Sequence, residues 1–375
     1  PWPRSLNQAN DPVAGQPSMK LMIAVTSILL LALVLGTYLL AKPAFQEQLG
    51  PGSFAGITVA PRDQALTLAR TVEGKSLLVM SADEQGVTAI DIGVASGSPF
   101  EDGLEAYSEL GPGGLQALFA ANPITVAWDR LGLPLQATYP HIAAGTNFHA
   151  HAEEVGLDAE PFLFPKLSHA SAWNAPVAAG KRLDHEVELC AVPLTEHLPA
   201  SPARLGYLLC GDFTDRWTLI RKMQFDSKMG RTGFPAGKGG STRLPVGPFL
   251  VIPLAEDFYE RVELRLYVNG ALRQRASAGQ MIWAPQDILS RALEDCRSPY
   301  TLGSETLSIS ACDRIPAGTL ILTGTPEGVM FHLLTLWSPW AYLQPGDRVT
   351  GYGTYLGLTQ NTIVGPAGPE GSSNE

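Results

Sequence analysis

The sequence is poor in charged residues. Charged side chains make up 17% of its 375 residues, against about 25% in ordinary soluble chains. Because 45% of the residues are hydrophobic, the composition excludes a disordered chain or a coiled coil. The 26 lysines and arginines are outnumbered by 36 acidic residues and do not cluster. The chain therefore lacks the basic surface that nucleic acid requires, and we expect no nucleic-acid partner.

Cysteine is also scarce. Four cysteines in 375 residues are too few for a disulfide scaffold. Cys190, Cys210, Cys296 and Cys312 form no CxxC pair, so they indicate neither a zinc site nor a redox dithiol. We expect four buried free thiols, because disulfides would require that this part of the chain lie outside the cytoplasm.

Glycine and proline are abundant, with 38 and 30 residues, and show no collagen-like period. Such frequent turn residues favour short strands over long helices. Two strands joined by a turn at Gln85 and Gly86 are expected within 76–93, and only 286–296 has a clear helical pattern. We therefore predict a small β-rich domain over 55–130 and a mainly β domain with some α over 131–364, followed by a disordered tail over 365–375.

One long apolar run lies between Lys20 and Lys42. As a helix, its 21 residues would span about 31 Å, the thickness of a bilayer core. The apolar character runs all round the helix, unlike that of a soluble surface helix, and no A-x-A cleavage site follows. We expect a retained transmembrane helix over 19–42, a single-pass membrane anchor, between a flexible tail (1–18) and a linker (43–54). The flanking positive charges balance, so the side that holds the rest of the chain is not indicated.

The densest polar cluster is GTNFHAHAEEVG, residues 145–156. It holds His149, His151, Glu153 and Glu154. A histidine beside a carboxylate is a general-base arrangement, because the carboxylate orients the ring and stabilises its protonated form. A His-x-His segment is also a metal-binding pattern, and a solvated loop has the same composition. The residues alone leave these three interpretations open.

Carboxylates recur further along the chain. In the strand pattern LDHEVELCAV, Glu186 and Glu188 share one face, where like charges repel. A divalent cation between them would remove that repulsion, and oxygen ligands suit Mg²⁺, Mn²⁺ or Ca²⁺. Asp212 follows the next apolar strand and is placed to supply a third ligand, with Arg216 after it as a partner for a substrate carboxylate. The alternative is an ordinary half-exposed strand face.

A glycine-rich loop, GKGGSTRLPVGP, carries Lys238. It lacks the spacing of a Walker motif. Its lysine is interpreted either as a cation that faces an oxyanion or as a surface residue.

Taken in order, these four stretches resemble the fumarylacetoacetate hydrolase family. Its members carry Gly-x-Asn-Tyr-x-x-His-x-x-Glu, then Glu-x-Glu, an aspartate at a strand end, and a Lys-Gly loop before Pro-x-Gly-Pro. The corresponding segments here read GTNFHAHAEE, EVE, DFTDR and KGGSTRLPVGP, and YVNGALRQ, LTGTPEGV and LQPGDRV also match. The similarity covers about 130–363.

The resemblance implies a mixed β-roll or β-sandwich that forms a homodimer and binds Mg²⁺, or Mn²⁺ or Ca²⁺ in its place. The family pattern selects His151 and Glu154 over the neighbouring histidine and glutamate. The implied metal ligands are Glu186, Glu188 and Asp212; the implied catalytic residues are His151, Glu154 and Lys238; and the implied substrate-binding residues are Arg216, Thr325 and Asn147.

The reaction that the resemblance implies is hydrolysis of a C–C bond in a 2-oxo acid or 1,3-diketone, such as an acylpyruvate or a fumarylacetoacetate-like compound. The metal would stabilise an enolate, His151 with Glu154 would activate water, and Lys238 would stabilise the oxyanion. Alternatives are a dehydratase, isomerase or decarboxylase of 2-oxo sugar acids on the same scaffold, and a non-catalytic membrane-tethered scaffold. The complete residue set argues against the last.

Several positions depart from the family pattern. Gly211 stands where an asparagine often precedes the metal aspartate, Trp217 where an acidic residue often follows the arginine, and Leu219 where the diketone hydrolases hold substrate with a polar side chain. The segment 331–343 is longer and more apolar than expected. It would contact the bilayer, line a substrate pocket or pack in the core, and we favour core packing.

Overall fold

The structure is a computed structural model that describes residues 19–40, 48, 54, 56–156, 160–199, 202–332 and 335–366. The chain divides into two compact units, residues 1–42 and 43–375, and each is described by itself. The predicted tail 1–18 and nearly all of the predicted linker 43–54 and tail 365–375 lie outside the described residues.

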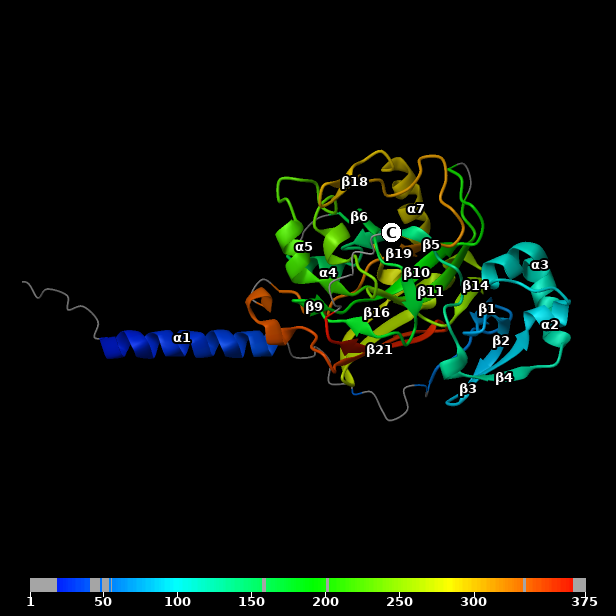
Figure 1. Cartoon of the computed structure of the whole chain (residues 1–375), viewed down its shortest axis with the longest axis horizontal. Helices are drawn as coiled ribbons and strands as arrows, with labels where there is room; N and C mark the ends of the chain where they lie inside the picture. The colour runs from blue at the N-terminus through cyan, green and yellow to red at the C-terminus, as the bar shows by residue number, and fades with distance from the viewer. Residues whose placement is uncertain are drawn as a thin grey trace, which may run out of the picture. The chain divides into compact units, whose positions relative to one another are not determined.

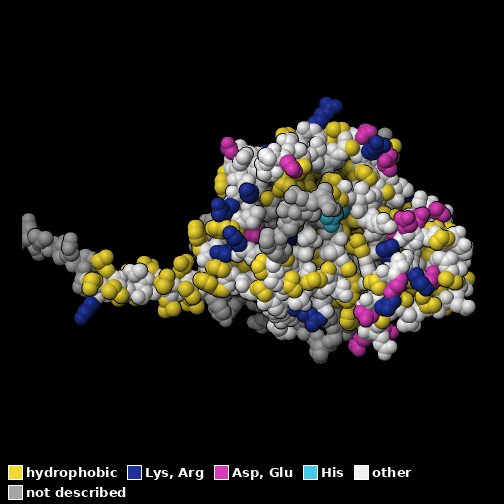
Figure 2. All heavy atoms as spheres, viewed as in Figure 1, with side chains coloured by type: hydrophobic (Ala, Val, Ile, Leu, Met, Phe, Trp, Pro, Cys, Tyr) yellow, Lys and Arg dark blue, Asp and Glu magenta, His cyan; other side chains and the backbone are white. Residues whose placement is uncertain are grey.

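The first unit contains a single described element, helix α1 (Met19–Leu40), which begins at the first residue of the predicted span. Its large side chains between Met19 and Leu35 are exposed, and Figure 2 shows the apolar groups along the helix. By length and composition α1 can cross a membrane, and a signal sequence near an N-terminus has the same properties. The apolar helix was therefore predicted, and its membrane insertion stays a prediction.

The second unit is built on a large sheet. Its strands run in the order β4-β3-β2-β1-β14-β11-β10-β19-β5-β6, and β13 and β7 branch from β11. The bounds are β1 (Ala65–Arg70), β2 (Ser76–Ala82), β3 (Gly86–Asp91), β4 (Ile124–Ala127), β5 (Thr138–Gly145), β6 (Phe162–Lys166), β7 (Ala170–Ala172), β10 (Val187–Pro193), β11 (Leu205–Gly211), β13 (Leu244–Val246), β14 (Leu250–Pro253) and β19 (Thr319–Leu322).

Central strands β10 and β11 explain where the core lies. All seven residues of each are buried, which fits their nearly continuous apolar sequences. One side of this pair packs against a five-stranded sheet in the order β16-β15-β20-β21-β8. These strands are β16 (Ala271–Ser277), β15 (Glu263–Val268), β20 (Arg348–Gly353), β21 (Gly357–Val364) and β8 (Val177–Ala178). The mixed β-rich architecture was predicted correctly.

Short strand pairs and helices complete the unit. The predicted helix within 286–296 is present as α7, and the predicted turn at Gln85 and Gly86 joins β2 to β3. Helix α3 was not predicted, because its sequence contains a Gly-Pro step; it bends at Gly111, whose backbone φ of +64° favours glycine. The remaining elements are α2 (Ile92–Ser96), α3 (Gly103–Ala117), α4 (His149–Glu154), α5 (Arg216–Lys222), α6 (Phe234–Gly237), α7 (Pro285–Glu294), β9 (Leu183–Asp184), β12 (Thr214–Asp215), β17 (Tyr300–Leu302) and β18 (Glu305–Leu307), with short 3₁₀ turns between them.

The predicted boundary near residue 130 does not separate two compact units. Strands β1–β4 lie with α2 and α3 at one end of the second unit (Figure 1). Strand β1 pairs antiparallel with β14, from Ala65 opposite Pro253 to Leu68 opposite Leu250. The region expected as a small β-rich domain is thus continuous with the large sheet, because one backbone ladder joins it to the rest.

The prediction of free cysteines was wrong. The structure contains two disulfides, Cys190–Cys210 and Cys296–Cys312, and no free cysteine. Their Cα atoms are 5.8 and 5.2 Å apart, within the range of protein disulfides. The sequence spacing does not indicate the first pair. The two cysteines meet only through the antiparallel register of β10 and β11.

The apolar segment 331–343 is only partly core. Leu336 and Tyr342 are buried, as expected, whereas Trp337 and Trp340 are 73% and 62% exposed. At its start, the ring of Phe331 lies 5.4 Å from the guanidinium carbon of Arg216. The segment therefore contributes both to the core and to the surroundings of a predicted site residue.

Candidate active site

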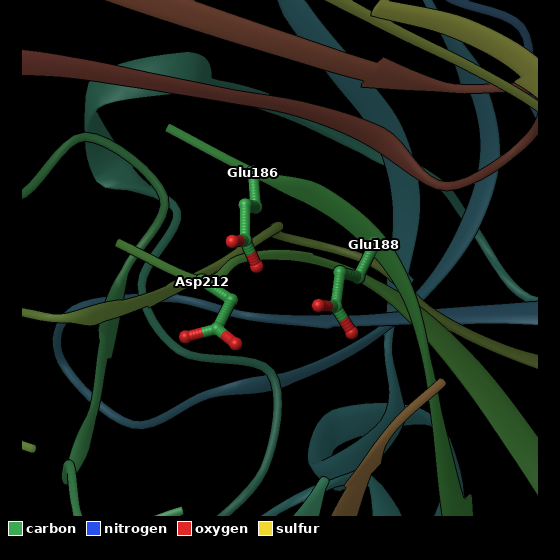
Figure 3. A group of neighbouring side chains, drawn as sticks. All are labelled: Glu186, Glu188 and Asp212. Atoms are coloured by element: carbon green, nitrogen blue, oxygen red, sulfur yellow. The ribbon is translucent and has the colours of Figure 1, made fainter. Parts of the chain in front are cut away.

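Three carboxylates converge where β10 begins and β11 ends. Glu186 directly precedes β10, Glu188 is its second residue, and Asp212 directly follows β11. The register places Val187 opposite Gly211, and the amide of Asp212 donates to the carbonyl of Glu186 over 3.0 Å. The side chains consequently point toward one another (Figure 3), with ligand oxygens within 4.8 Å of each other. All three are buried. The fold thus brings the predicted metal ligands together.

Two lysines contact this cluster. Lys238 Nζ donates to Asp212 Oδ2 over 2.8 Å and also to Glu186. Lys166 Nζ donates to the other oxygen, Asp212 Oδ1, over 2.6 Å. The loop containing Lys238 is held in place because its backbone carbonyl accepts from Lys166 over 2.6 Å. Lys238 is therefore a buried cation at the site, and the surface-lysine interpretation is wrong.

Arg216, a predicted substrate-binding residue, contacts two carboxylates of the protein. Its Nε donates to Asp184 Oδ2 over 2.8 Å, and its Nη2 to Glu186 Oε1 over 2.5 Å. Although burial alone would raise the pKa of Glu186, the ammonium of Lys238 and the guanidinium of Arg216 lower it. Asp184 also accepts from the amide of Met330 over 2.9 Å. Arg216 therefore orients a predicted metal ligand, and two of its donors are committed to protein.

Glu188 has no cationic partner of its own. Its Oε2 accepts from the amide of Gly324 over 2.7 Å, and no described lysine or arginine forms an ion pair with it. Burial and the nearby Asp212 carboxylate raise the pKa of Glu188. Around it lie three other buried carboxylates (Asp184, Glu186 and Asp212) and three buried cations (Lys166, Arg216 and Lys238).

This donor set fits a hard divalent cation. Oxygen-only ligands are those that Mg²⁺, Mn²⁺ and Ca²⁺ prefer. A cation between the three carboxylates would also neutralise Glu188, whose charged form is disfavoured by burial. The residues that would hold it are Glu186, Glu188 and Asp212.

A short helix carries the predicted histidine–glutamate pair. Helix α4 carries His151, which is 6% exposed, while His149 is exposed to solvent. His151 Nδ1 lies 3.3 Å from Glu154 Oε2, and the amide of Gly328 donates to both oxygens of Glu154 over 3.0 and 3.1 Å. His151, when protonated, is one of the groups that lower the pKa of Glu186. The predicted His151–Glu154 pair is thus formed with a buried histidine, whereas the neighbouring His149 is exposed.

Two predicted substrate-binding residues are occupied by protein contacts. Asn147 is fully buried; its Nδ2 donates to the carbonyls of Trp283 and Thr323 over 3.0 and 2.8 Å, and its Oδ1 accepts from the amide of Trp283 over 2.7 Å. Thr325 Oγ1 donates to the carbonyl of Val187 over 3.0 Å and accepts from Gln274 over 2.9 Å. Both side chains hold backbone around the site, because their hydrogen-bonding groups are already paired.

Sequence reasoning missed Lys166 and Asp184. Lys166 ends β6, an otherwise apolar strand whose five residues are all buried. A lysine at a buried strand position is itself a signal, since an unpaired buried charge is strongly disfavoured. Asp184 lies two residues before Glu186 and was available as a third acidic position. Only the fold shows that it binds Arg216.

The three positions that depart from the family pattern pack against neighbouring protein groups. Leu219 is buried in α5 against Gly237 of α6, so it offers packing where a polar group was expected. Trp217 is half-buried and lies 5.5 Å from the guanidinium carbon of Arg182. Gly211 faces the ring of Pro245, whose Cγ would be 3.0 Å from an added Cβ. The absence of an asparagine side chain there thus matches a close packing contact.

Comparison with known proteins decides the family. The family described as Fumarylacetoacetate (FAA) hydrolase C-terminal matches residues 140–364, which is more than half of the chain and contains the whole candidate site. The chain belongs to the fumarylacetoacetate hydrolase family. Its β-rich fold is shared with solved structures of fumarylacetoacetate hydrolase family proteins, and its relatives include enzymes.

Individual relatives are distant. The 2,4-didehydro-3-deoxy-L-rhamnonate hydrolase of Sphingomonas sp. is 29% identical over 56% of this chain and 69% of its own. The mitochondrial oxaloacetate tautomerase of Oryza sativa is 31% identical over 52% of this chain and 82% of its own. Maleylpyruvate hydrolase from Sphingobium sp. SYK-6, solved with manganese(II) and pyruvate, has a TM-score of 0.54 and 20% identity over 80% of this chain and 100% of its own.

Proposed function

We propose that the protein is a divalent-metal-dependent hydrolase that cleaves a C–C bond in a 2-oxo acid or 1,3-diketone of the acylpyruvate type. The observation that carries the proposal is the buried set of Glu186, Glu188 and Asp212, one of which lacks a cationic partner among the described residues, together with a buried histidine paired with a glutamate. A buried carboxyl group without a cationic partner lowers stability, so a scaffold without catalysis would gain nothing by keeping one.

Metal binding is supported by the donor set. The cation would be held by Glu186, Glu188 and Asp212, with Mn²⁺ or Mg²⁺ as the candidates. When bound, it supplies a Lewis acid that polarises the carbonyl oxygens of a 2-oxo acid. The manganese and pyruvate in the Sphingobium maleylpyruvate hydrolase are consistent with this proposal.

The chain's own residues provide the proton chemistry. Glu154 receives the backbone amide of Gly328 and lies beside His151 Nδ1, so it fixes the orientation of the ring. The other ring nitrogen is then free to take a proton from water, as a general base. Lys238 uses two donor interactions on Glu186 and Asp212. Its third ammonium proton remains to face the oxygen on which negative charge develops during attack on the carbonyl.

The apolar wall suggests the part of the substrate that lies away from the carboxyl group. Leu219 replaces the polar side chain that the resemblance places there, and Phe331 covers Arg216. We expect a substrate whose acyl portion is apolar, since a hydrophobic wall offers no partner for an additional polar group.

Keto–enol tautomerisation is a second candidate activity. It is favoured by the Oryza sativa relative, an oxaloacetate tautomerase. The same metal ligands would serve it, and His151 would move a proton between carbon and oxygen of the substrate instead of activating water. Product analysis distinguishes the two, because only hydrolysis yields two fragments.

The first experiment is calorimetric titration of the full chain in detergent with Mn²⁺ and Mg²⁺, with oxalate as a 2-oxo acid mimic. The comparison uses Glu188→Ala and, as a matched control, Glu153→Ala, which changes an exposed glutamate beside the site. We expect metal-dependent oxalate binding in the parent and the control and its loss in Glu188→Ala. A folded parent that binds no metal would overturn the proposal. A panel of acylpyruvates and oxaloacetate then separates cleavage from tautomerisation.

We further propose that α1 anchors the protein in a lipid bilayer. Its described large apolar side chains are exposed, and its length suits a bilayer core. Alkaline carbonate extraction of membranes tests this: an anchored chain stays in the pellet at full length, whereas a cleaved signal sequence gives a shorter chain in the supernatant.

A further inference from the structure

The disulfide Cys190–Cys210 joins the two strands that carry the metal ligands. Cys190 lies two residues after Glu188 on β10, and Cys210 lies two residues before Asp212 on β11. Residues two apart on a strand share a face. The register places Glu188 opposite Cys210, so the disulfide lies on the same face as the carboxylates and directly beside them.

The disulfide links β10 and β11 near the end of their ladder, where three carboxylates converge. The pairing of β10 with β11 ends at Val187 opposite Gly211. Beyond it lie the backbone bond from Asp212 to Glu186 and the two-residue pairing of β9 with β12. At that end the carboxylates of Glu186, Glu188 and Asp212 converge within 4.8 Å, and like charges repel. A covalent link between the strands opposes their separation without adding a charge.

We propose that the Cys190–Cys210 disulfide is a positioning element of the metal site, which holds Glu188 and Asp212 at the separation needed to share one cation. The inference rests on the proposed function, because it concerns the site through which that function would operate. Both cysteines are fully buried, so the bond is set when the chain folds. Formation requires that two thiols lose two protons and two electrons to an external protein disulfide, by thiol–disulfide exchange.

The inference has a consequence for compartment. Disulfides persist where the surroundings are oxidising and are rare where thiols are kept reduced. All four cysteines of the chain are paired. The metal site would therefore be completed only when residues 43–375 mature in an oxidising compartment, and the side of the membrane that the flanking charges left undecided would be the non-cytosolic one.

The second disulfide supplies a matched control. Cys296–Cys312 joins the residues after α7 to an exposed position at Cys312, and it lies on neither ligand strand. Its loop of 16 residues is close in length to the 20 of Cys190–Cys210, so the two bonds constrain the unfolded chain to a similar degree. Removing either bond has a comparable effect on the unfolded state, and only one removal affects the strands of the site.

The experiment compares the full chain in detergent with the double variants Cys190→Ala/Cys210→Ala and Cys296→Ala/Cys312→Ala. Mn²⁺ binding is titrated by calorimetry without substrate, and circular dichroism verifies folding. We expect the Mn²⁺ dissociation constant to rise about 10- to 100-fold in the first variant, the range for groups that support a metal ligand, and to stay within about twofold in the control. A second variant, Cys190→Val/Cys210→Ala, refills the core if the first does not fold.

Three outcomes would overturn the proposal. One is unchanged Mn²⁺ affinity in folded Cys190→Ala/Cys210→Ala. Another is free thiols at Cys190 and Cys210 when cells are alkylated before lysis and the peptides are mapped without reduction. The third is that neither variant at this pair folds while the control does, which would make the bond a folding requirement only. If the parent itself binds no Mn²⁺, the proposed function fails, and the peptide map still decides whether the bond exists.

Discussion

The floor and the cover of the candidate site differ in how firmly they are held. The floor consists of the buried carboxylates Glu186, Glu188 and Asp212, at the ends of β10 and β11 that meet. Lysine and arginine side chains hold Glu186 and Asp212, and the amide of Gly324 holds Glu188. The cover is the six-residue helix α4, whose Glu154 is attached through the amide of Gly328. The floor is built to keep charges in fixed places, whereas the cover presents one histidine. Changes in the floor should therefore affect metal binding and stability together, and changes in the cover should affect turnover alone.

The strongest way to break the floor is Asp212→Asn. This change removes a metal ligand and also the carboxylate charge that Lys166 and Lys238 share. We expect Mn²⁺ affinity to fall by more than about 100-fold and the free energy of unfolding to fall by about 3–5 kcal/mol, because buried cations lose their partner. Calorimetry and urea denaturation measure the two effects. Retention of Mn²⁺ affinity within tenfold of the parent would contradict this view of the floor.

The matching test of the cover is His151→Asn. It removes the proposed base and leaves the three carboxylates in place. We expect kcat for C–C cleavage to fall by about 10²- to 10⁴-fold, the usual contribution of a general base, while Mn²⁺ affinity stays within about twofold. His149→Asn serves as the control, since that side chain is exposed. A loss of metal binding in His151→Asn would show that cover and floor are not separable.

Arg216→Met tests the support beneath the floor. Without the guanidinium, Asp184 and Glu186 keep their buried negative charges and lose the cation between them. We expect the free energy of unfolding to fall by about 3–5 kcal/mol. Arg216→Lys should recover only part of this, because an ammonium cannot reproduce the two-pronged contact. A Met variant as stable as the parent in urea would mean that Arg216 serves the substrate rather than the fold.

The division between floor and cover also explains what the sequence could predict. Motif spacing identified Glu186, Glu188, Asp212 and Lys238, because strand alternation places acidic residues on one face and the family pattern orders the stretches. It did not identify Lys166, which lies 46 residues from Asp212 in sequence and meets it only through sheet pairing. Long-range contacts of this kind depend on topology that local periodicity does not contain.

The predicted roles of three residues stay predictions, because the structure shows only their contacts with protein. Asn147, Thr325 and Arg216 were assigned to substrate because their side chains can bind carboxylates and carbonyls. In the fold their donors are used by Trp283, Val187 and Asp184 respectively. Whether a polar group is free depends on the backbone groups that surround it after folding. The pairing of the cysteines was missed for the same reason, since the strand register is a property of the folded sheet.

The smallest effect that we predict is a loss of stability in acid through His141. It concerns the large sheet that carries the floor and not the chemistry of the cover. His141 lies in β5, opposite Lys166 of β6, and is buried. Burial, with the charges of Lys166 and His169, lowers its pKa from 6.5 to about 4. In acid, the imidazole of the unfolded chain takes up a proton near pH 6.5, whereas the buried one does so only near pH 4. The unfolded state thus binds more protons than the folded state between these two pH values. The free energy of unfolding therefore decreases as the pH is lowered.

The expected loss from this histidine is about 3 kcal/mol between pH 7 and pH 4. Urea denaturation at both pH values, in the parent and in His141→Gln, measures it. Because glutamine does not titrate, the variant should lose less stability on acidification than the parent by that amount, although it is less stable at pH 7. His169→Gln is the control for the neighbouring histidine, whose charge is the smaller influence on His141. If the parent and His141→Gln lose the same free energy of unfolding between pH 7 and pH 4, groups other than His141 cause the acid sensitivity.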